Sequence, residues 1–259
     1  MRITGWFNMQ LRRYGPFIVL LLLILACWET AARTGIVPAF ILPAPTAVWA
    51  ALLSQAPLLL GTHLPATLTE ALLGFALAAG GGTVLGAAMH LYGPLEKALY
   101  PLLIISQTIP MIALSPVFIL WFGYTLWSKL AVVLLTAFFP VVVGTFDGLR
   151  AGGDMYKDLL LTLGAGRRQL FFKTQIPMAL PAYFSGLKLC IVYCVIGATI
   201  GEWLGGGKGL GYYSRRTAGN LQSAEMFAAI LLLALLGMAL FLAMALLERI
   251  ILKKRGLLL

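Results

Sequence analysis

The sequence predicts an all-α, polytopic membrane protein, and two observations carry that prediction. Of its 259 residues, 61% are hydrophobic and only 11% are charged, with a mean hydropathy of +0.94. Several apolar runs reach the ~20 residues that a helix needs to cross a bilayer. No segment alternates apolar and polar residues in the way that outer-membrane barrel strands do.

The apolar runs predict about six transmembrane helices in a single domain. Residues 1–16 are expected to be a cytoplasmic segment, residues 17–249 the membrane domain, and residues 250–259 a basic cytoplasmic tail. The expected spans are at about residues 17–32, 67–91, 98–122, 126–146, 182–204 and 226–247.

The net charge of +10 indicates orientation rather than nucleic-acid binding. With six spans, fourteen of the nineteen Lys and Arg residues lie on the side of the termini and five on the other side. Because cytoplasmic loops collect Lys and Arg, both termini are expected to be cytoplasmic, in a bacterial inner membrane. The run after Arg12 and Arg13 could also be a signal peptide, but the membrane-embedded remainder favours a retained span.

Small residues recur every four positions in the second span. Gly74, Ala78, Gly82 and Gly86 therefore share one face of a helix. Small residues on one face let two helix backbones approach closely. The spacing predicts a close-packed interface, either within the chain or between subunits.

The third span combines prolines with polar residues. Pro101, Pro110 and Pro116 lie within it, and Ser106, Gln107 and Thr108 are near its middle. A proline frees backbone carbonyls, which a membrane tolerates where they face protein or water. We expect Ser106, Gln107, Thr108 and Pro110 to line a translocation pathway; the alternative is hydrogen bonding between helices.

A basic loop at residues 150–181 lies between the fourth and fifth spans. Lys157–Leu163 and Arg167–Gln175 are predicted to be short helices, joined by a turn at Gly164-Ala165-Gly166. Pro177 and Pro181 are expected to end the second helix and begin the fifth span. From these residues alone, the loop could dock a partner or could rest on anionic lipid.

A glycine-rich external segment at residues 201–213 follows the fifth span. Glu202, Trp203, Gly209 and Gly211 are candidates for an outer gate or a dock for a binding protein. The alternative is a simple glycine turn with an interfacial aromatic anchor.

The sequence contains no pattern typical of an enzyme or a metal site. The three cysteines (Cys27, Cys190 and Cys194) lie in apolar segments, and the two histidines lie near the ends of spans, so we expect no metal site. A phosphate loop of the form GxxxxGK[ST] is absent, so the chain cannot supply an ATPase. Few carboxylates lie in mid-span, which disfavours an ion-coupled carrier.

The 150–181 loop resembles the coupling motif of bacterial ABC-importer permeases. That motif opens with an acidic residue and two alanines, continues with a glycine, and ends in Leu-Pro or Ile-Pro. Here Asp158, Gly164 and Ile176-Pro177 have the matching spacing, whereas Leu159 and Leu160 replace the alanines.

The resemblance covers nearly the whole chain after residue 40. LPAPTAV, SQTIPMIALSPVFILWFG, FFPVVVGTFDGLR and TIGEWLGGGKGLGYY are similar to permeases of nitrate, sulfonate, taurine and thiamine-precursor importers. Glu70, the SQTIP stretch and the run MFAAILLLALLGMALF look most like the hydroxymethylpyrimidine branch.

The resemblance implies the fold and the partners of a type I importer. It implies a homodimer of permeases in the bilayer, two copies of a cytoplasmic ATPase that bind ATP and Mg, and an extracytoplasmic binding protein. This chain would bind no cofactor, and its cargo would be a small nutrient such as a thiamine pyrimidine precursor, or else nitrate, sulfonate or taurine. The implied coupling residues are Asp158, Leu159, Leu160, Gly164, Ala165, Gly166, Arg167, Phe171 and Pro177.

Overall fold

The fold is helical throughout the part of the chain that the structure describes. The computed structural model describes residues 3–154 and 157–255, with side chains for residues 15–151 and 159–255. No strand occurs among them, which confirms the predicted fold class. The elements are α1 (Ile3–Arg33), α2 (Pro45–Ser54), α3 (Ala56–Leu58), the π-helical turn η1 (Leu59–His63), α4 (Leu64–Leu91), α5 (Gly93–Thr108), α6 (Met111–Phe122), α7 (Leu126–Asp154), α8 (Lys157–Thr162), α9 (Arg167–Leu170), the π-helical turn η2 (Phe171–Gln175), α10 (Ile176–Gly205), α11 (Leu210–Gly219) and α12 (Ser223–Lys254).

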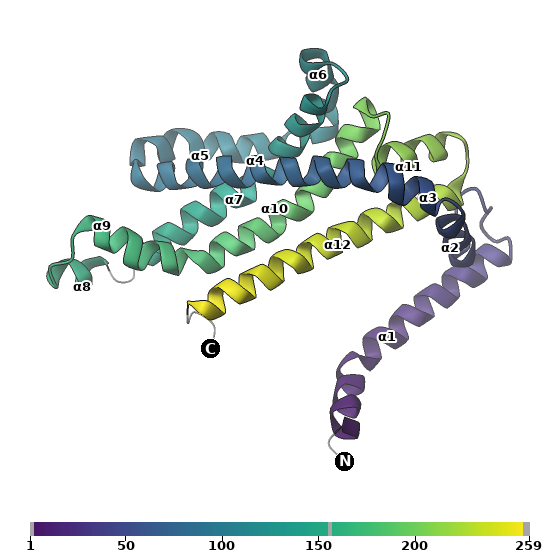
Figure 1. Cartoon of the computed structure of the whole chain (residues 1–259), viewed down its shortest axis with the longest axis horizontal. Coiled ribbons are helices and arrows are strands. Elements are labelled where there is room, and N and C mark those ends of the chain that lie inside the picture. Colours follow the sequence, from purple (N-terminus) through teal and green to yellow (C-terminus); the bar gives the residue numbers. More distant parts are fainter. Residues whose placement is uncertain (1–2, 155–156, 256–259) are drawn as a thin grey trace.

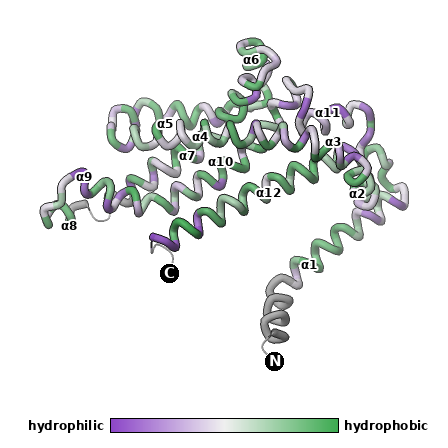
Figure 2. Tube along the Cα trace, viewed as in Figure 1, coloured by the Kyte–Doolittle hydropathy of each residue, from purple (hydrophilic) through white to green (hydrophobic). Residues whose placement is uncertain are grey.

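The long helices run lengthwise and leave the short ones at the two ends of the molecule (Figure 1). At one end lie α8, α9, the turn between α4 and α5, and the end of α12; at the other lie α2, α3 and α11. Hydrophobic residues cover the lengths of the helices, whereas hydrophilic residues gather near these ends (Figure 2). Among the described residues, five helices are long and apolar enough to cross a membrane, or six if α5 and α6 form one span. This arrangement confirms a multi-pass membrane protein.

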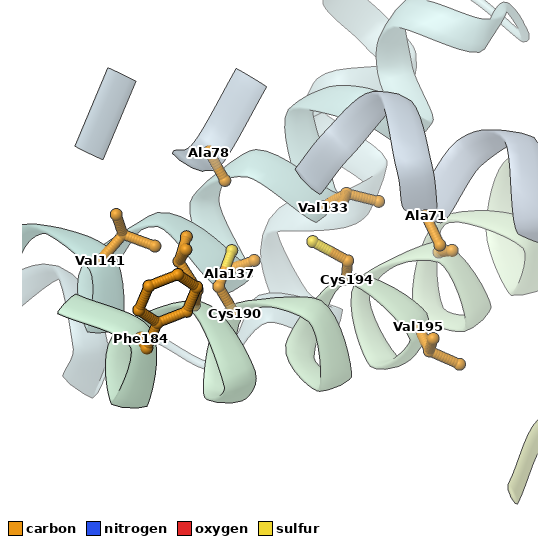
Figure 3. Packing of buried hydrophobic residues seen from close by; sticks show 11 residues of the cluster. Ala71, Ala78, Val133, Ala137, Val141, Phe184, Cys190, Cys194 and Val195 are labelled. Carbon is orange, nitrogen blue, oxygen red and sulfur yellow. The ribbon is translucent and has the colours of Figure 1, made fainter. Parts of the chain in front are cut away.

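The core lies between α4, α7 and α10, which pack extensively on one another. Ala71 and Ala78 of α4 face Val133 and Val141 of α7, and both helices lie against α10 (Figure 3). Cys190 and Cys194 of α10 are fully buried in this cluster as unpaired thiols. They act as small apolar residues, as the sequence indicates.

The small-residue face of α4 lies against α7 within the same chain. Gly74, Ala78, Gly82 and Gly86 are all buried. A Cβ at Gly74 would lie 2.1 Å from Val133 Cγ1, and one at Gly86 would lie 2.6 Å from the Val142 carbonyl oxygen. The absence of side chains at these glycines is therefore what lets the two helices approach so closely.

The third predicted span is broken, which corrects the expectation of one continuous helix over residues 98–122. Helices α5 and α6 meet at an angle of 102°, and α6 projects away from the bundle (Figure 1). Ile109 is extended, at φ −81° and ψ 122°, because the ring of Pro110 disfavours helical geometry in the preceding residue. We call the residues around this bend, 106–110, the elbow.

The fifth span begins earlier than predicted, because neither Pro177 nor Pro181 ends a helix. Helical structure is continuous from Arg167 to Gly205. Pro177 lies in the first turn of α10, just after η2, and Pro65 lies just after η1 in the same way. A proline ring clashes with the carbonyl four residues earlier, and in both places that carbonyl belongs to the wider π turn. Similarly, the second span begins at Ala56 rather than at residue 67, and α7 continues beyond residue 146.

Helix α1 is attached to the rest of the chain only near its C-terminal end, among the described residues. The Trp28 indole N–H donates to the Pro43 carbonyl at 3.0 Å, and Glu29 accepts the backbone N–H of Thr46 at 3.1 Å. Its apolar side chains from Phe17 to Leu25 are exposed in the single chain. The membrane or another subunit must therefore cover them.

Candidate functional site: the external latch, the elbow and the 157–175 loop

The end of the molecule that holds α11 contains a buried polar cluster, which ties the segment after α10 to α4. Glu202 is wholly buried near the end of α10. Its Oε1 accepts the Thr67 hydroxyl at 2.6 Å, and its Oε2 accepts the Gly211 backbone N–H at 2.6 Å. We call His63, Thr67, Glu202 and residues 209–211 the external latch, after the side of the membrane on which the sequence predicts this segment.

Three consecutive backbone N–H groups enter the external latch. The N–H of Gly209 donates to His63 Nδ1 at 3.1 Å, and that of Leu210 donates to the Thr67 hydroxyl oxygen at 2.8 Å. The third is the Gly211 N–H on Glu202. These groups lie at the start of α11, where unpaired N–H groups and the helix dipole favour a negative charge. The Glu202 carboxyl therefore supplies from within the chain the anion that such a site attracts.

The glycines of the external latch make room for the Glu202 carboxyl. Gly209 has a φ of +117°, and a Cβ there would lie 2.0 Å from Glu202 Cδ. A Cβ on Gly211 would lie 2.8 Å from Glu202 Oε2. In contrast, Gly207 has open space around it. At positions 209 and 211 the glycines therefore let the backbone lie directly against the Glu202 carboxyl, and the motif is not merely a flexible turn.

The four outer-gate candidates have different positions in the structure. Glu202, Gly209 and Gly211 come together inside the external latch, whereas Trp203 is 40% exposed. The carbonyl of Trp203 accepts a hydrogen bond from Arg215. Sequence reasoning missed His63 and Thr67 as partners of this segment, although both are polar residues at the start of an apolar helix.

A buried ion pair lies beside the external latch. Lys129 Nζ of α7 is 2.5 Å from Glu70 Oε1 of α4, with side chains 12% and 5% exposed. The second carboxyl oxygen of Glu70 is buried and has no hydrogen-bond donor in the described part of the chain. Helices α4, α7 and α10 thus meet through charged and polar groups at this end.

The elbow displays the polar residues that the sequence assigned to a pathway. Ser106 and Thr108 donate to the carbonyls of Leu103 and Ile105, at 2.7 and 2.8 Å. Gln107 is exposed, and its amide makes only a 3.4 Å contact with the Ser106 hydroxyl. The elbow therefore presents a primary amide and a helix end whose carbonyls have lost their intrahelical donors.

At the opposite end of the molecule, α8 and α9 are joined by a tight turn at Gly164. Gly164 has a φ of +85°, its N–H donates to the Leu161 carbonyl at 3.0 Å, and the Ala165 N–H donates to the Leu160 carbonyl at 2.9 Å. These two bonds form a Schellman motif, which favours glycine at the position of positive φ. Gly166 precedes α9, Arg167 is exposed, and Asp158 falls among the residues whose side chains are not described.

This loop has an exposed apolar surface and an anchored base. Leu159, Leu163 and Phe172 are 58%, 74% and 64% exposed. Phe171 stacks on His90 at the end of α4 with ring centroids 6.5 Å apart, and His90 Nε2 lies 3.3 Å from the buried Gln175 Oε1. The loop therefore projects beyond the bundle and is joined at its base to α4.

Residues 78–255 match the family described as the binding-protein-dependent transport system inner membrane component. The chain belongs to this family. The permease is 44% identical to the formylaminopyrimidine transport permease protein ThiX of Halalkalibacterium halodurans, over 90% of this chain and 93% of the relative. It is 36% identical to the riboflavin transport system permease protein RibX of Chloroflexus aurantiacus, over 91% and 88%. It is 33% identical to a putative aliphatic sulfonates transport permease protein, SsuC of Bacillus subtilis, over 95% and 90%.

Membership and the membrane fold agree on the permease's role. It is a transmembrane permease subunit of an ABC importer, a class of subunit that translocates cargo and is not an enzyme. Transport by the family depends on a binding protein, as the family's description states.

Proposed function

We propose that two copies of this permease form the pathway of an importer for a thiamine pyrimidine precursor and couple to a separate cytoplasmic ATPase through the 157–175 loop. The observation that carries the coupling proposal is the loop's exposed apolar surface on a base anchored to α4. An apolar surface that projects from the bundle into water is a docking surface more often than a stable free one. The basic residues Arg167 and Arg168 beside it are compatible with the cytoplasmic side.

The base of the loop offers a physical route for coupling. Phe171 and Gln175 contact His90 at the end of α4, and His63 in η1, just before the start of α4, holds the Gly209 backbone. Because a helix is stiff along its axis, a displacement of the loop by an ATPase would move α4 and with it the external latch. The importer would contain two copies of the ATPase, one for each permease, and these copies would bind ATP and Mg.

Replacement of Phe172 by Arg tests the docking surface. We expect Phe172→Arg to weaken co-purification of the ATPase by at least about tenfold, because a central exposed aromatic is a typical hot spot. The control is Ile36→Arg, which changes an apolar residue at the opposite end that is exposed at least as much as Phe172. Unchanged ATPase binding by the Phe172 variant, with the permease correctly inserted, would remove the loop from the interface.

The elbow supports the pathway part of the proposal. A broken helix at membrane depth is tolerated where its backbone faces protein or a water-filled cavity. In one chain Gln107 is exposed, so a second copy facing the elbow would enclose the space that the amide lines. Ser106, Thr108 and Pro110 would contribute the rest of this lining.

Removal of the Gln107 amide tests the pathway. We expect Gln107→Leu to lower uptake by about two- to tenfold, the effect of one lost hydrogen bond, while assembly with the ATPase is retained. Gln107→Asn, which keeps the amide, is the matched control and is expected to transport better than the Leu variant. Equal uptake by the wild-type and Leu chains would exclude Gln107 from the pathway.

The substrate proposal rests on the similarity to the formylaminopyrimidine permease of H. halodurans. The 33% identity to a sulfonate permease supports an alkanesulfonate as the second candidate. Binding of formylaminopyrimidine, hydroxymethylpyrimidine and alkanesulfonates to the cognate binding protein, followed by uptake of the tightest ligand, distinguishes the two. Tight binding of a sulfonate alone would overturn the pyrimidine proposal.

A further inference from the structure

Three charged side chains, one of them Glu202 of the external latch, meet at this end of α4, and their charges do not cancel. Glu70 and Glu202 bring two carboxyl groups, and Lys129 brings one ammonium group. Glu202 is fully buried and Glu70 is 4% exposed. With both carboxyls ionised, this region would carry one uncompensated negative charge away from water, which is expensive.

The hydrogen bonds of this cluster leave one buried oxygen without a donor among the described residues. Both oxygens of Glu202 accept donors, from Thr67 and from the Gly211 N–H, and Glu70 Oε1 accepts Lys129. Glu70 Oε2 is buried without a donor, and the neighbouring carboxyl within hydrogen-bonding reach is that of Glu202. Two carboxylates cannot hydrogen-bond to each other, whereas a carboxylic acid and a carboxylate can.

The other charged and titratable groups near the cluster do not supply the missing charge. His63 accepts the Gly209 N–H through Nδ1, so its ring is neutral in this arrangement. Arg216 of α11 is exposed to solvent. Lys129 is the one cation that reaches the cluster from α7, among the described residues.

We propose that Glu70 and Glu202 hold one proton between them, in a hydrogen bond that joins Glu70 Oε2 to the Glu202 carboxyl. The proton supplies the donor that Glu70 Oε2 lacks, and it makes the Glu70–Lys129–Glu202 cluster electrically neutral. This proton stays bound in the protein and is not transported, because the cluster belongs to the packed contact between α4, α7 and α10. The inference stands on this contact and does not depend on the substrate or on the docking of the ATPase.

A second ion pair in the same protein provides a matched comparison. Lys188 of α10 and Glu248 of α12 lie 2.6 Å apart, with side chains 21% and 17% exposed. This pair has one charge of each sign, and no second carboxyl among the described residues is paired with it. Neutralising Glu248 therefore leaves a cation without its partner, whereas neutralising Glu70 leaves its cluster with the net charge that we propose.

The test uses the full-length chain in lipid nanodiscs at neutral pH and compares Glu70→Gln with Glu248→Gln. The wild-type infrared spectrum is expected to contain a carboxylic-acid C=O band that is lost in Glu70→Gln and retained in Glu248→Gln. The unfolding temperature of Glu70→Gln is expected to stay within about 3 °C of the wild-type value, whereas Glu248→Gln lowers it by roughly 6 °C or more. Absence of that band, or a Glu70→Gln chain as unstable as Glu248→Gln, would overturn the proposal.

Discussion

Gly209 combines two constraints that exclude a side chain. Its φ of +117° is strained for any residue with a Cβ, and that Cβ would overlap the Glu202 carboxyl. Gly209→Ala is therefore expected to lower stability by about 2–5 kcal/mol, the sum of backbone strain and overpacking. Thermal unfolding in lipid nanodiscs measures this effect.

Gly207 provides the control for this prediction in the same motif. A Cβ there has nothing within 4 Å and no positive φ, so Gly207→Ala is expected to leave the unfolding temperature nearly unchanged. If both variants had the same unfolding temperature, the glycines would provide flexibility alone, and the close approach of Gly209 to Glu202 would not contribute to stability.

The sequence predicts the members of the external latch unequally. The density of glycines around Gly209 and Gly211 marks a special backbone, and Glu202 lies in the same motif. Its hydrogen-bonding partner Thr67 is 135 positions away, so only the packing of α4 on α10 brings the two together. An acidic residue beside Trp203 at the end of a span indicates an interfacial position, and nothing local shows that its carboxyl turns inward.

At the scale of elements, the contact of α4 with α7 depends on which glycines lie on the shared face. Gly86→Ala would place a Cβ 2.6 Å from the Val142 carbonyl oxygen and 2.8 Å from Thr145 Cβ, so the helices must separate. We expect a loss of about 1–3 kcal/mol, measured by thermal unfolding. Gly81→Ala lies in the same helix with open space around it and is expected to be neutral or slightly stabilising. Equal losses from both variants would contradict a specific interface.

The break between α5 and α6 shows where helix prediction from sequence stops. Pro101 and Pro116 remain inside helices, whereas the chain bends just before Pro110. Ser106 and Thr108, which precede Pro110, donate their hydroxyls to the carbonyls of Leu103 and Ile105. Hydroxyl side chains of this kind compete with the backbone for helix carbonyls. The composition of the span contains this signal, but hydropathy alone does not separate a bent span from a straight one.

At the scale of the whole molecule, hydropathy and charge predict much of the architecture. The length of the apolar runs locates the spanning helices, because a helix needs about 20 apolar residues to cross a bilayer. The spacing of small residues identifies the face of α4 that meets α7. Helix bounds are less predictable, since helical structure continues through Pro65 and Pro177 with a π turn before each. The sequence of a single chain does not indicate what covers an exposed apolar surface such as that of α1.

Orientation in the membrane is a property of the whole chain, and cysteine labelling measures it. In a Cys27→Ser background, where Cys190 and Cys194 are buried, we expect Ile36→Cys to react with a membrane-impermeant maleimide in intact spheroplasts. Leu163→Cys is equally exposed but lies at the opposite end, so it should react only after permeabilisation. The physical reason is the excess of Lys and Arg on the side of the loop and the termini. The reverse labelling pattern would place the 157–175 loop outside the cell, where no ATPase could reach it, and would overturn the coupling proposal together with the orientation.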